Sequence, residues 1–387
     1  MKFNLFMYCI VGRRAELEAG MAGKNPELYQ RMITEIGEYA RFADQSGFSG
    51  FGHPEHHMQI EGFEISNEPT LMGMWLGSHS EKLRIITCGF VSTTHNPVRT
   101  AESIATMDHM LGGRFGVGLV RGYQHRWLEN FKIRDDLAAV GPWNKDTPVD
   151  DMNREYFAEF VDIVLTALRE DTFSYRGQFW DFPRKDDANP HEHPVYSKFG
   201  QGVSKEMKIS EVGIAPRPLQ YPHPPLYGGF THSLRTAKFW AKYKGKPIVL
   251  ANNFEFCKSL WAEYKTEAQK YGHDIKPGQE AGWGGIMICA ETDEKAQAWA
   301  EDMRWFWNAW STPFGQGLPE LLIGSPDTLT RRIEEASGAV PIEETFLLIP
   351  QGLHTRDQIL HSLDLFASKV IPRFSDASPE ALLSGVA

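Results

Sequence analysis

Short apolar runs alternate along the chain with longer segments in which apolar residues recur every three or four positions. The runs predict eight strands, at residues 3–9, 48–52, 83–91, 114–120, 225–230, 247–251, 283–290 and 345–351. A helix candidate follows each of them. Continuous apolar strands that alternate with amphipathic helices are typical of a parallel sheet covered by helices.

Two of the helices show this periodicity most clearly. The helix between the first two strands carries its apolar residues on one face, at Leu28, Met32, Ile36, Tyr39, Ala40 and Ala43. Gly47 follows it at a position where a helix end favours positive φ. The last helix repeats the pattern at Ile359, Leu363, Phe366 and Val370.

Eight strand–helix units predict a closed (β/α)8 TIM barrel, a scaffold of about 250 residues. An open doubly wound sheet with a second domain is the alternative. We expect one domain over residues 1–387, with insertions after strands four and seven at about 122–224 and 303–324. Both insertions follow strands, so in a barrel they lie at the C-terminal face, where active sites are built.

Charge and cysteine content narrow the classes of protein. The chain has 40 basic and 50 acidic residues and no basic patch, which disfavours a nucleic-acid partner.

The first apolar run could be mistaken for a signal peptide. Asn4 interrupts this run and Arg13 and Arg14 follow it, which favours a buried strand over a signal peptide. No run approaches the ~18 apolar residues of a membrane span. Four scattered cysteines without a CxxC pair indicate reduced thiols in a cytoplasmic protein.

The most concentrated chemical signal is HPEHH at residues 53–57, directly after the second strand. It is compatible with a metal site, a general acid or base, or a polar loop. A metal site needs further His, Asp or Glu ligands from other strand ends. Those ends carry hydroxyls, amides and an arginine instead, so we expect no metal.

Arg121 ends the fourth strand in an acidic chain. It is compatible with an ion pair to a neighbouring carboxylate, or with a phosphate clamp completed by Ser233 and Thr236 at a helix N-terminus. Gly116 and Gly118 lie inside the strand rather than at a turn that opens a helix. They therefore make a poor dinucleotide fingerprint, and we interpret them as room for a flat ring near the backbone.

Several motifs together resemble the bacterial luciferase-like flavin-dependent monooxygenases, from Lys2 to about Phe374. They are GFSGFGHPEHH, HNPVR, LGGRFGVGLVRGY, APRPLQYPHPPLYGG and FLLIPQGLHTRDQILHSLDLFASKVIPRF. The resemblance implies a (β/α)8 barrel that uses reduced FMN from a separate NAD(P)H:flavin reductase and activates O2 as a flavin C4a-peroxide. It also implies a homodimer through the helices at about 68–79 and 97–110.

The resemblance further implies roles for individual residues. His56 matches the catalytic histidine of the family's EH pair, and Glu55 matches its partner in that pair. Cofactor-binding positions are Cys88 and Gly89, whose non-prolyl cis peptide supports the isoalloxazine ring, Arg121 and Arg154 for the FMN phosphate, and the neighbouring Thr231, His232, Ser233 and Thr236. Val120 stands where the luciferase α chain has a cysteine, which argues against light emission.

The local chemistry of His56 agrees with such a role. An imidazole with an ordinary pKa of about 6.5 exchanges a proton near neutral pH. Glu55 could hold it, although the partner of Glu55 could equally be His57 or a backbone group. The substrate pocket is predicted from His57 and from the lid candidate at residues 303–314, with Trp305, Phe306, Trp307 and Trp310 as lining. The alternative for this segment is core packing against the barrel.

We therefore predict a two-component monooxygenase that uses FMNH2 and O2 to oxidise a small apolar or aromatic substrate. Baeyer–Villiger, hydroxylation and ring-opening outcomes all remain open. Three alternatives are a non-catalytic flavin-binding partner subunit, a deazaflavin-dependent oxidoreductase that transfers hydride, and a metal-dependent hydrolase that uses HPEHH.

Overall fold

The computed structural model of the chain describes residues 1–184, 188–189, 191–315, 317 and 319–374. The chain forms two compact units. The first contains Met1–Gly89, Gly116–Gly118 and the chain from Pro225 onward, and the second contains Phe90–Phe115 and Leu119–Pro224. A single domain over residues 1–387 stays a prediction, and its last part, 375–387, lies outside the described residues.

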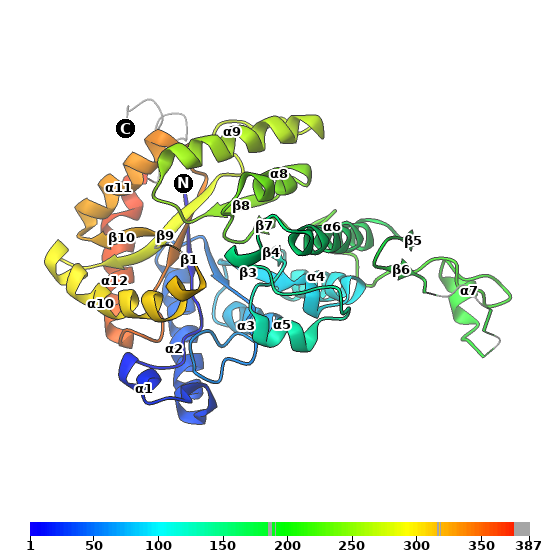
Figure 1. Cartoon of the computed structure of the whole chain (residues 1–387), viewed down its shortest axis with the longest axis horizontal. Helices are drawn as coiled ribbons and strands as arrows, with labels where there is room; N and C mark the ends of the chain where they lie inside the picture. The colour runs from blue at the N-terminus through cyan, green and yellow to red at the C-terminus, as the bar shows by residue number, and fades with distance from the viewer. Residues whose placement is uncertain (185–187, 190, 316, 318, 375–387) are drawn as a thin grey trace. The chain divides into compact units, whose positions relative to one another are not determined.

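A closed barrel of eight parallel strands forms the core of the first unit (Figure 1). The strands are β1 (Lys2–Phe6), β2 (Gly50–His53), β3 (Arg84–Val91), β4 (Phe115–Val120), β7 (Leu226–Gly228), β8 (Lys246–Val249), β9 (Gly282–Cys289) and β11 (Glu344–Leu348). Each pairs with the next, and β11 pairs with β1 to close the ring. The predicted TIM barrel and its eight strands are confirmed.

A further strand, β10 (Glu320–Gly324), was not predicted and lies in the segment assigned to the second insertion. It pairs with β9 from Gly285 to Cys289, on the edge opposite β11. β8 pairs with the beginning of the same edge of β9, at Gly282 and Trp283. Glycines in β9 allow this crowding, because a methyl group at Gly285 would collide with the backbone of Glu320.

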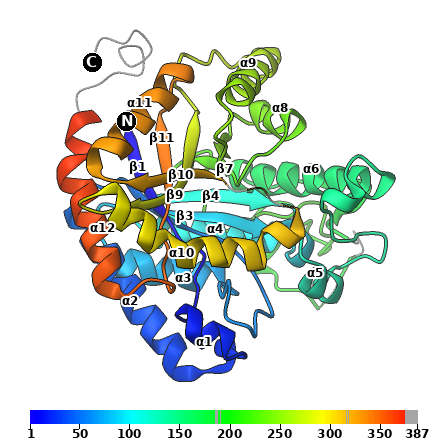
Figure 2. The ribbon, with the colours of Figure 1, turned by 60° about the vertical axis from the view of Figure 1, so that its left-hand side comes forward.

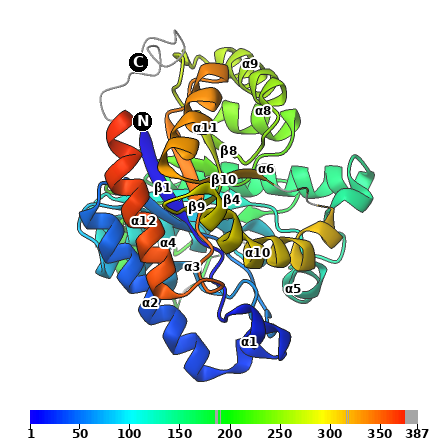
Figure 3. The ribbon, with the colours of Figure 1, turned by 90° about the vertical axis from the view of Figure 1, so that its left-hand side faces the viewer.

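Helices of the first unit cover the outside of the barrel. They are α1 (Arg14–Glu18), α2 (Pro26–Gln45), α3 (Pro69–Ser78), α8 (Leu234–Lys242), α9 (Phe254–Lys270), α10 (Asp293–Trp310), α11 (Pro326–Ala339) and α12 (Arg356–Lys369). Figures 2 and 3 show α11, α12 and α2 in succession along the outside. In α2 the predicted face is buried from Met32 to Ala43, and Gly47 has the predicted positive φ of 87°.

Polar side chains from four strands meet at the N-terminal end of the barrel. Glu344 of β11 accepts hydrogen bonds from Lys246 at 2.5 Å, from Asn4 at 3.0 Å and from Tyr227 at 3.2 Å. Lys246 also lies 2.9 Å from Glu343. Buried charges are tolerated when paired and hydrogen-bonded, so this cluster joins β1, β7, β8 and β11 by electrostatic contacts.

The second unit is mainly helical and includes the predicted insertion at 122–224. Its elements are α4 (Pro97–Met110), α5 (His125–Phe131), α6 (Pro148–Arg169), α7 (Val195–Phe199) and the two-stranded β5 (Tyr175–Arg176) and β6 (Asp181–Phe182). The helix predicted from MNREYFAEFVDIVLTALRE is confirmed as part of α6, which packs along α4. Within the described residues of both units, every helix is too short or too polar to cross a membrane.

Candidate active site

The loop after β2 places the three histidines of HPEHH in different environments. His53 is fully buried, with Nδ1 3.1 Å from the carbonyl oxygen of Pro54 and Nε2 3.4 Å from Thr87 Oγ1. Burial lowers the pKa of His53 to about 4. Both ring nitrogens of this neutral histidine have protein partners, which is the arrangement of a structural residue.

Glu55 pairs with His57 rather than with His56. Its Oε1 lies 2.7 Å from His57 Nε2, and its side chain is fully buried. Of the partners considered for Glu55, His57 is present in the structure.

His56 faces a different carboxylate, Glu64, which sequence reasoning missed. His56 Nδ1 lies 3.0 Å from Glu64 Oε2, and the two side chains are only 8% and 3% exposed. Burial lowers the pKa of His56 to about 3, against the opposing effect of the Glu55 charge, so its imidazole is neutral near pH 7. The ordinary pKa expected for His56 was wrong for this reason.

The chain returns on itself to bring Glu64 to His56. The backbone N–H of His56 donates to Ser66 O at 3.0 Å, and that of Ile65 donates to Cys9 O at 2.9 Å. Glu64 stands between two apolar residues, Phe63 and Ile65, seven positions beyond the HPEHH motif. An isolated acid in such a run is the signal that could have identified it.

Aromatic side chains of α10 pack against this returning loop. Phe63 stacks on Phe306 at 5.5 Å and on Trp310 at 5.4 Å between ring centroids, and lies 5.7 Å from Trp305. Phe306 and Trp307 also contact Tyr8, the second residue after β1, at 5.9 and 6.5 Å. The structure thus brings Trp305, Phe306 and Trp310 against Phe63 of this loop, and Trp307 against Tyr8.

The large side chains near the end of α10 differ in how deeply they are buried. Met303, Phe306 and Trp307 are buried, as core packing requires, whereas Trp305 and Trp310 are only half-buried. A lid role for the whole of 303–314 stays a prediction.

The C-terminal part of β3 contains the predicted cis peptide, between Cys88 and Gly89. Burial raises the pKa of the Cys88 thiol to about 12, so the thiol stays protonated. A Cβ at Gly118 would lie 2.8 Å from Thr87 O and 2.9 Å from Cys88 Cα, and one at Gly116 would meet the ring of Tyr227. The space beside these two glycines is filled by protein, so they serve strand packing, and their interpretation as room for a flat ring was wrong.

Hydroxyl groups gather where β7 leads into α8. Ser233 caps α8, with its Oγ accepting from the Thr236 N–H at 3.2 Å and lying 2.9 Å from Thr236 Oγ1. Thr231 is buried and donates to Gly228 O, while His232 is exposed. Predicted roles of these four residues in cofactor binding stay predictions.

In the second unit, Arg121 and Arg154 converge on one buried carboxylate, Asp150. Arg121 Nη1 lies 2.5 Å from Asp150 Oδ1, and Arg154 Nε lies 3.0 Å from Oδ2. Burial opposes ionisation of Asp150, but the two guanidinium groups hold its pKa below the ordinary value. The ion pair considered for Arg121 is present, and Asp150 is shared by two cations.

Sequence reasoning missed Asp150, although its spacing of four residues from Arg154 on a helix is a recognisable ion-pair signal.

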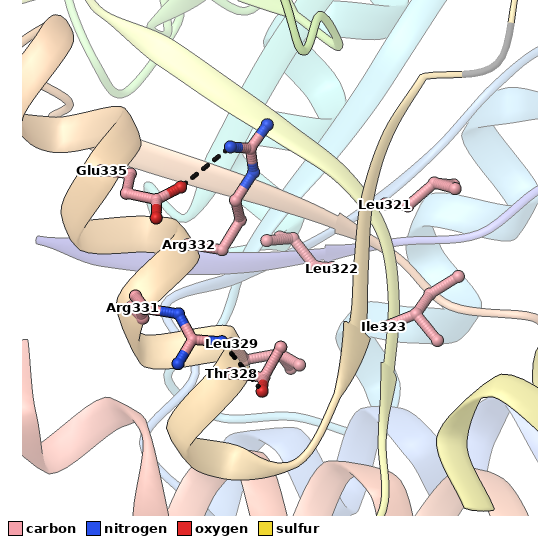
Figure 4. Close-up of a pocket in the computed structure, with 8 residues that line it drawn as sticks. All are labelled: Leu321, Leu322, Ile323, Thr328, Leu329, Arg331, Arg332 and Glu335. Atoms are coloured by element: carbon pink, nitrogen blue, oxygen red, sulfur yellow. Dashed lines mark hydrogen bonds and ion pairs between the residues drawn. The ribbon is translucent and has the colours of Figure 1, made fainter. Parts of the chain in front are cut away.

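No group of three or more His, Cys, Asp or Glu side chains among the described residues is arranged to hold a metal ion. A pocket of about 220 Å³ lies between β10 and α11 and contains none of the predicted site residues (Figure 4). Its Arg332 is bound by Glu320 at 2.7 Å and by Glu335 at 2.9 Å, so its charge is already balanced.

The family model described as luciferase-like monooxygenase matches residues 7–341. The FMNH2-dependent dimethylsulfone monooxygenase of Pseudomonas putida is 24% identical over 261 residues, which cover 67% of this chain and 59% of that protein. The match thus spans about three fifths of that relative's length.

Two solved structures share the fold over nearly their whole length. Monooxygenase RslO1 from Streptomyces bottropensis has a TM-score of 0.74 at 18% identity, covering 97% of this chain and 100% of that chain. The oxygenating constituent of 3,6-diketocamphane monooxygenase of Pseudomonas putida, a type II Baeyer–Villiger monooxygenase in complex with FMN, has a TM-score of 0.71 at 18% identity, covering 96% and 98%. Because the family model matches residues 7–341, most of the chain, the chain belongs to the luciferase-like monooxygenase family.

Proposed function

We propose that the protein is a two-component monooxygenase that uses FMNH2 and O2 to oxidise a small apolar or aromatic substrate. The observation that carries this proposal is the buried His56–Glu64 pair, in a chain of this family, on a loop whose Phe63 stacks on Phe306 of α10. A buried, neutral imidazole suits proton transfer in a site from which water is excluded. The names of the relatives, FMNH2-dependent for one and in complex with FMN for another, support the cofactor.

The chain offers residues of the right chemistry for FMN. We assign the phosphate to Arg121 and Arg154, because their two guanidinium groups converge at one place and guanidinium groups bind phosphate oxygens well. When bound, reduced FMN supplies two electrons and the centre at which O2 reacts.

Protein groups would then perform the binding, the exclusion of water and the proton handling. Phe63, Phe306 and Trp310 form an apolar stack that water cannot hydrogen-bond, which favours an apolar or aromatic substrate. His57 is held by Glu55 and is the candidate polar contact in this region.

The proposed donor of FMNH2 is a separate protein, an NAD(P)H:flavin reductase. Exposed Leu71 and Trp75, one turn apart on α3, suit the proposed homodimer through the helices at about 68–79 and 97–110. The four cysteines are free and buried, which fits a reducing cytoplasm.

Phosphate binding is tested with Arg121→Met and Arg154→Met. Each loses charge-assisted hydrogen bonds, so the Kd for FMN measured by equilibrium dialysis should rise roughly 10- to 100-fold. Arg169→Met is the matched control, because Arg169 is exposed and its guanidinium group pairs with Glu170 at 2.7 Å. Unchanged FMN affinity in both arginine variants would remove them from the phosphate site.

The reaction is tested with the full chain, a flavin reductase, NADH, FMN and ¹⁸O2 over a panel of aldehydes, cyclic ketones and sulfones. We expect one ¹⁸O atom in the product of at least one compound, detected by mass spectrometry. Binding of a reduced deazaflavin without binding of FMNH2 would favour the hydride-transfer alternative. Activity only after addition of a second, related chain would favour the partner-subunit alternative.

A further inference from the structure

We propose that the indole N–H of Trp307 is the hydrogen-bond donor that holds the substrate, and that the substrate therefore carries an uncharged acceptor such as a carbonyl oxygen. This inference deepens the proposed function and rests on it for the reaction that follows binding. Binding itself can be tested without any turnover.

Trp307 carries a buried donor that the described part of the chain leaves without an acceptor. The residue is only 4% exposed, and no acceptor among the described residues hydrogen-bonds its Nε1. A buried indole N–H usually finds a hydrogen-bond partner. Folded proteins keep few unpaired groups of this kind, so the N–H of Trp307 requires an explanation other than the packing of the chain.

Aromatic rings surround this donor. Trp307 contacts Tyr8 at 6.5 Å between ring centroids, and Tyr8 in turn contacts Phe306 at 5.9 Å and Phe230 at 6.4 Å. A buried water needs about two to four polar partners, which the phenylalanine rings do not supply, and a ring face is only a weak acceptor for an N–H. An oxygen atom on an apolar ligand suits this place better, because the rest of the ligand packs against the rings.

The backbone is strained at the two strand ends that carry this cluster. Tyr8 lies two residues beyond β1 and is followed by Cys9, whose φ is 59°, while Phe230 lies two residues beyond β7 and has a φ of 36°. Both φ values fall in the left-handed region that favours glycine, and strained residues of this kind gather at binding and catalytic sites. β1 and β7 end at the C-terminal face of the barrel, where this fold builds its active sites.

Exposure changes across the cluster. Tyr8 and Trp307 are buried, whereas Phe230 is half-buried. A ligand that enters beside Phe230 places its leading end on the buried side, where the N–H of Trp307 lies.

The chemistry of the cluster determines the class of ligand. An indole N–H can only donate, so the ligand supplies the acceptor. The phenol of Tyr8 is neutral at pH 7, because burial raises its pKa well above the usual value. A carboxylate would lose its hydration among these rings with one N–H to replace it, which is unfavourable. A ketone or an aldehyde has an uncharged oxygen that a single donor can satisfy.

The donor is observed by NMR on the full-length protein with FMN present and with ¹⁵N in its indole N–H groups. Acetophenone and cyclohexanone are the carbonyl probes. Isopropenylbenzene and methylenecyclohexane, in which a CH2 group replaces the oxygen, are their matched controls. At least one carbonyl probe should move the Trp307 proton signal downfield, and its hydrocarbon control should not.

The signal of Trp307 is assigned by its loss in Trp307→Phe. If this variant does not fold, through-space contacts to the ring protons of Tyr8 assign the signal in wild type.

Removing the N–H should weaken the binding of the carbonyl probe alone. Trp307→Phe keeps an aromatic ring and should raise the Kd of that probe roughly 3- to 10-fold, the usual effect of one lost hydrogen bond, with the Kd of its hydrocarbon control unchanged. Trp299→Phe is the matched variant on the same helix, because Trp299 is half-buried and contacts His354 at 6.3 Å. It should leave both Kd values as in wild type.

The outcomes separate this proposal from the proposed function. No downfield shift with either carbonyl probe, or the same shift with the matching hydrocarbon, would overturn the role of Trp307. Equal losses of affinity for a carbonyl probe and its control in Trp307→Phe would also overturn it. A shifted Trp307 signal without oxygenation of any compound by wild type would count against the monooxygenase activity alone.

Discussion

Histidines that are close in sequence differ in chemistry because their neighbours differ. His53 uses both ring nitrogens on Pro54 and Thr87, whereas His56 has Glu64 at Nδ1. His57 is occupied by Glu55. Adjacent residues of an extended loop point in different directions, so each histidine of the motif meets a different part of the first unit. Of the three, His56 is the buried histidine that lies 3.0 Å from a carboxylate, whereas His57 beside Glu55 is only half-buried.

We expect His56→Ala to retain FMN binding and to lose product formation by roughly 10²- to 10⁴-fold, the usual contribution of a general acid or base. The rate of oxygenated product and the Kd for FMN are measured on the same preparation. His361→Ala is the control, since His361 is a partly exposed histidine paired with Glu291. Full turnover in His56→Ala would show that proton transfer does not use this residue.

At the scale of the element, α10 combines a packing face with a face that is partly open. Phe306 is fully buried between Phe63 and Tyr8, while Trp310 stacks on the same Phe63 but remains half-buried. One helix therefore anchors the loop of His56 and also presents aromatic surface that a substrate can contact.

The two faces predict different results for two substitutions. Phe306→Ala should lower the free energy of unfolding by about 3 to 5 kcal/mol, because it empties a closed core position. Trp310→Ala should cost about 1 kcal/mol and chiefly change the KM for substrate. Urea unfolding followed by circular dichroism gives both stabilities. Equal losses from the two substitutions would contradict this division.

The spacing of apolar residues predicted the barrel because each kind of element has its own burial pattern. A strand such as β9 is buried along its whole length, and a helix such as α2 is buried on one face. That spacing missed β10 because ELLIG is short and lies at the end of a segment rich in aromatics, where an insertion was expected. The spacing of residues missed Glu64 and Asp150 because His56 and Arg121, their partners, are brought to them by the tertiary fold. Pairing of Glu55 with His57 has the same origin, since spacing alone allowed three partners.

For the molecule as a whole, the ion cluster at the N-terminal end of the barrel links the first and last strands of the ring. Lys246 and Lys2 both approach Glu343 and Glu344, but their side chains are 7% and 57% exposed. Solvent screens the contacts of Lys2 and not those of Lys246.

Removing one member of the buried pair should therefore be costly. We expect Lys246→Ala to lower the free energy of unfolding by about 3 to 5 kcal/mol, because Glu344 is left buried without its counter-ion. Lys2→Ala, the matched control, should cost less than about 1 kcal/mol. Similar stabilities of the two variants in urea would show that the buried pair is not what supports closure.

The same cluster predicts a loss of stability in acid. Burial opposes ionisation, but Lys246 holds the pKa of Glu343 at about 2, against 4.5 in the ordinary group, and lowers that of Glu344. As pH falls the unfolded chain binds protons first, so this contribution is complete above about pH 4.5 and is lost towards pH 2. Thermal melts over this range should show the decline in wild type, and a weaker decline in Lys246→Met. An equal decline in both would place the acid sensitivity elsewhere.

Pairing of β1 with β11 has a consequence during synthesis on the ribosome. Lys2 pairs with Glu344, so one edge of the first strand has no partner until nearly the last strand has emerged. At 5 to 20 residues per second this wait lasts roughly 20 to 70 s. An apolar strand with an open edge is a template for association with other chains. Translation speed and chaperone supply, rather than the stability of the finished barrel, should therefore limit the yield of soluble protein.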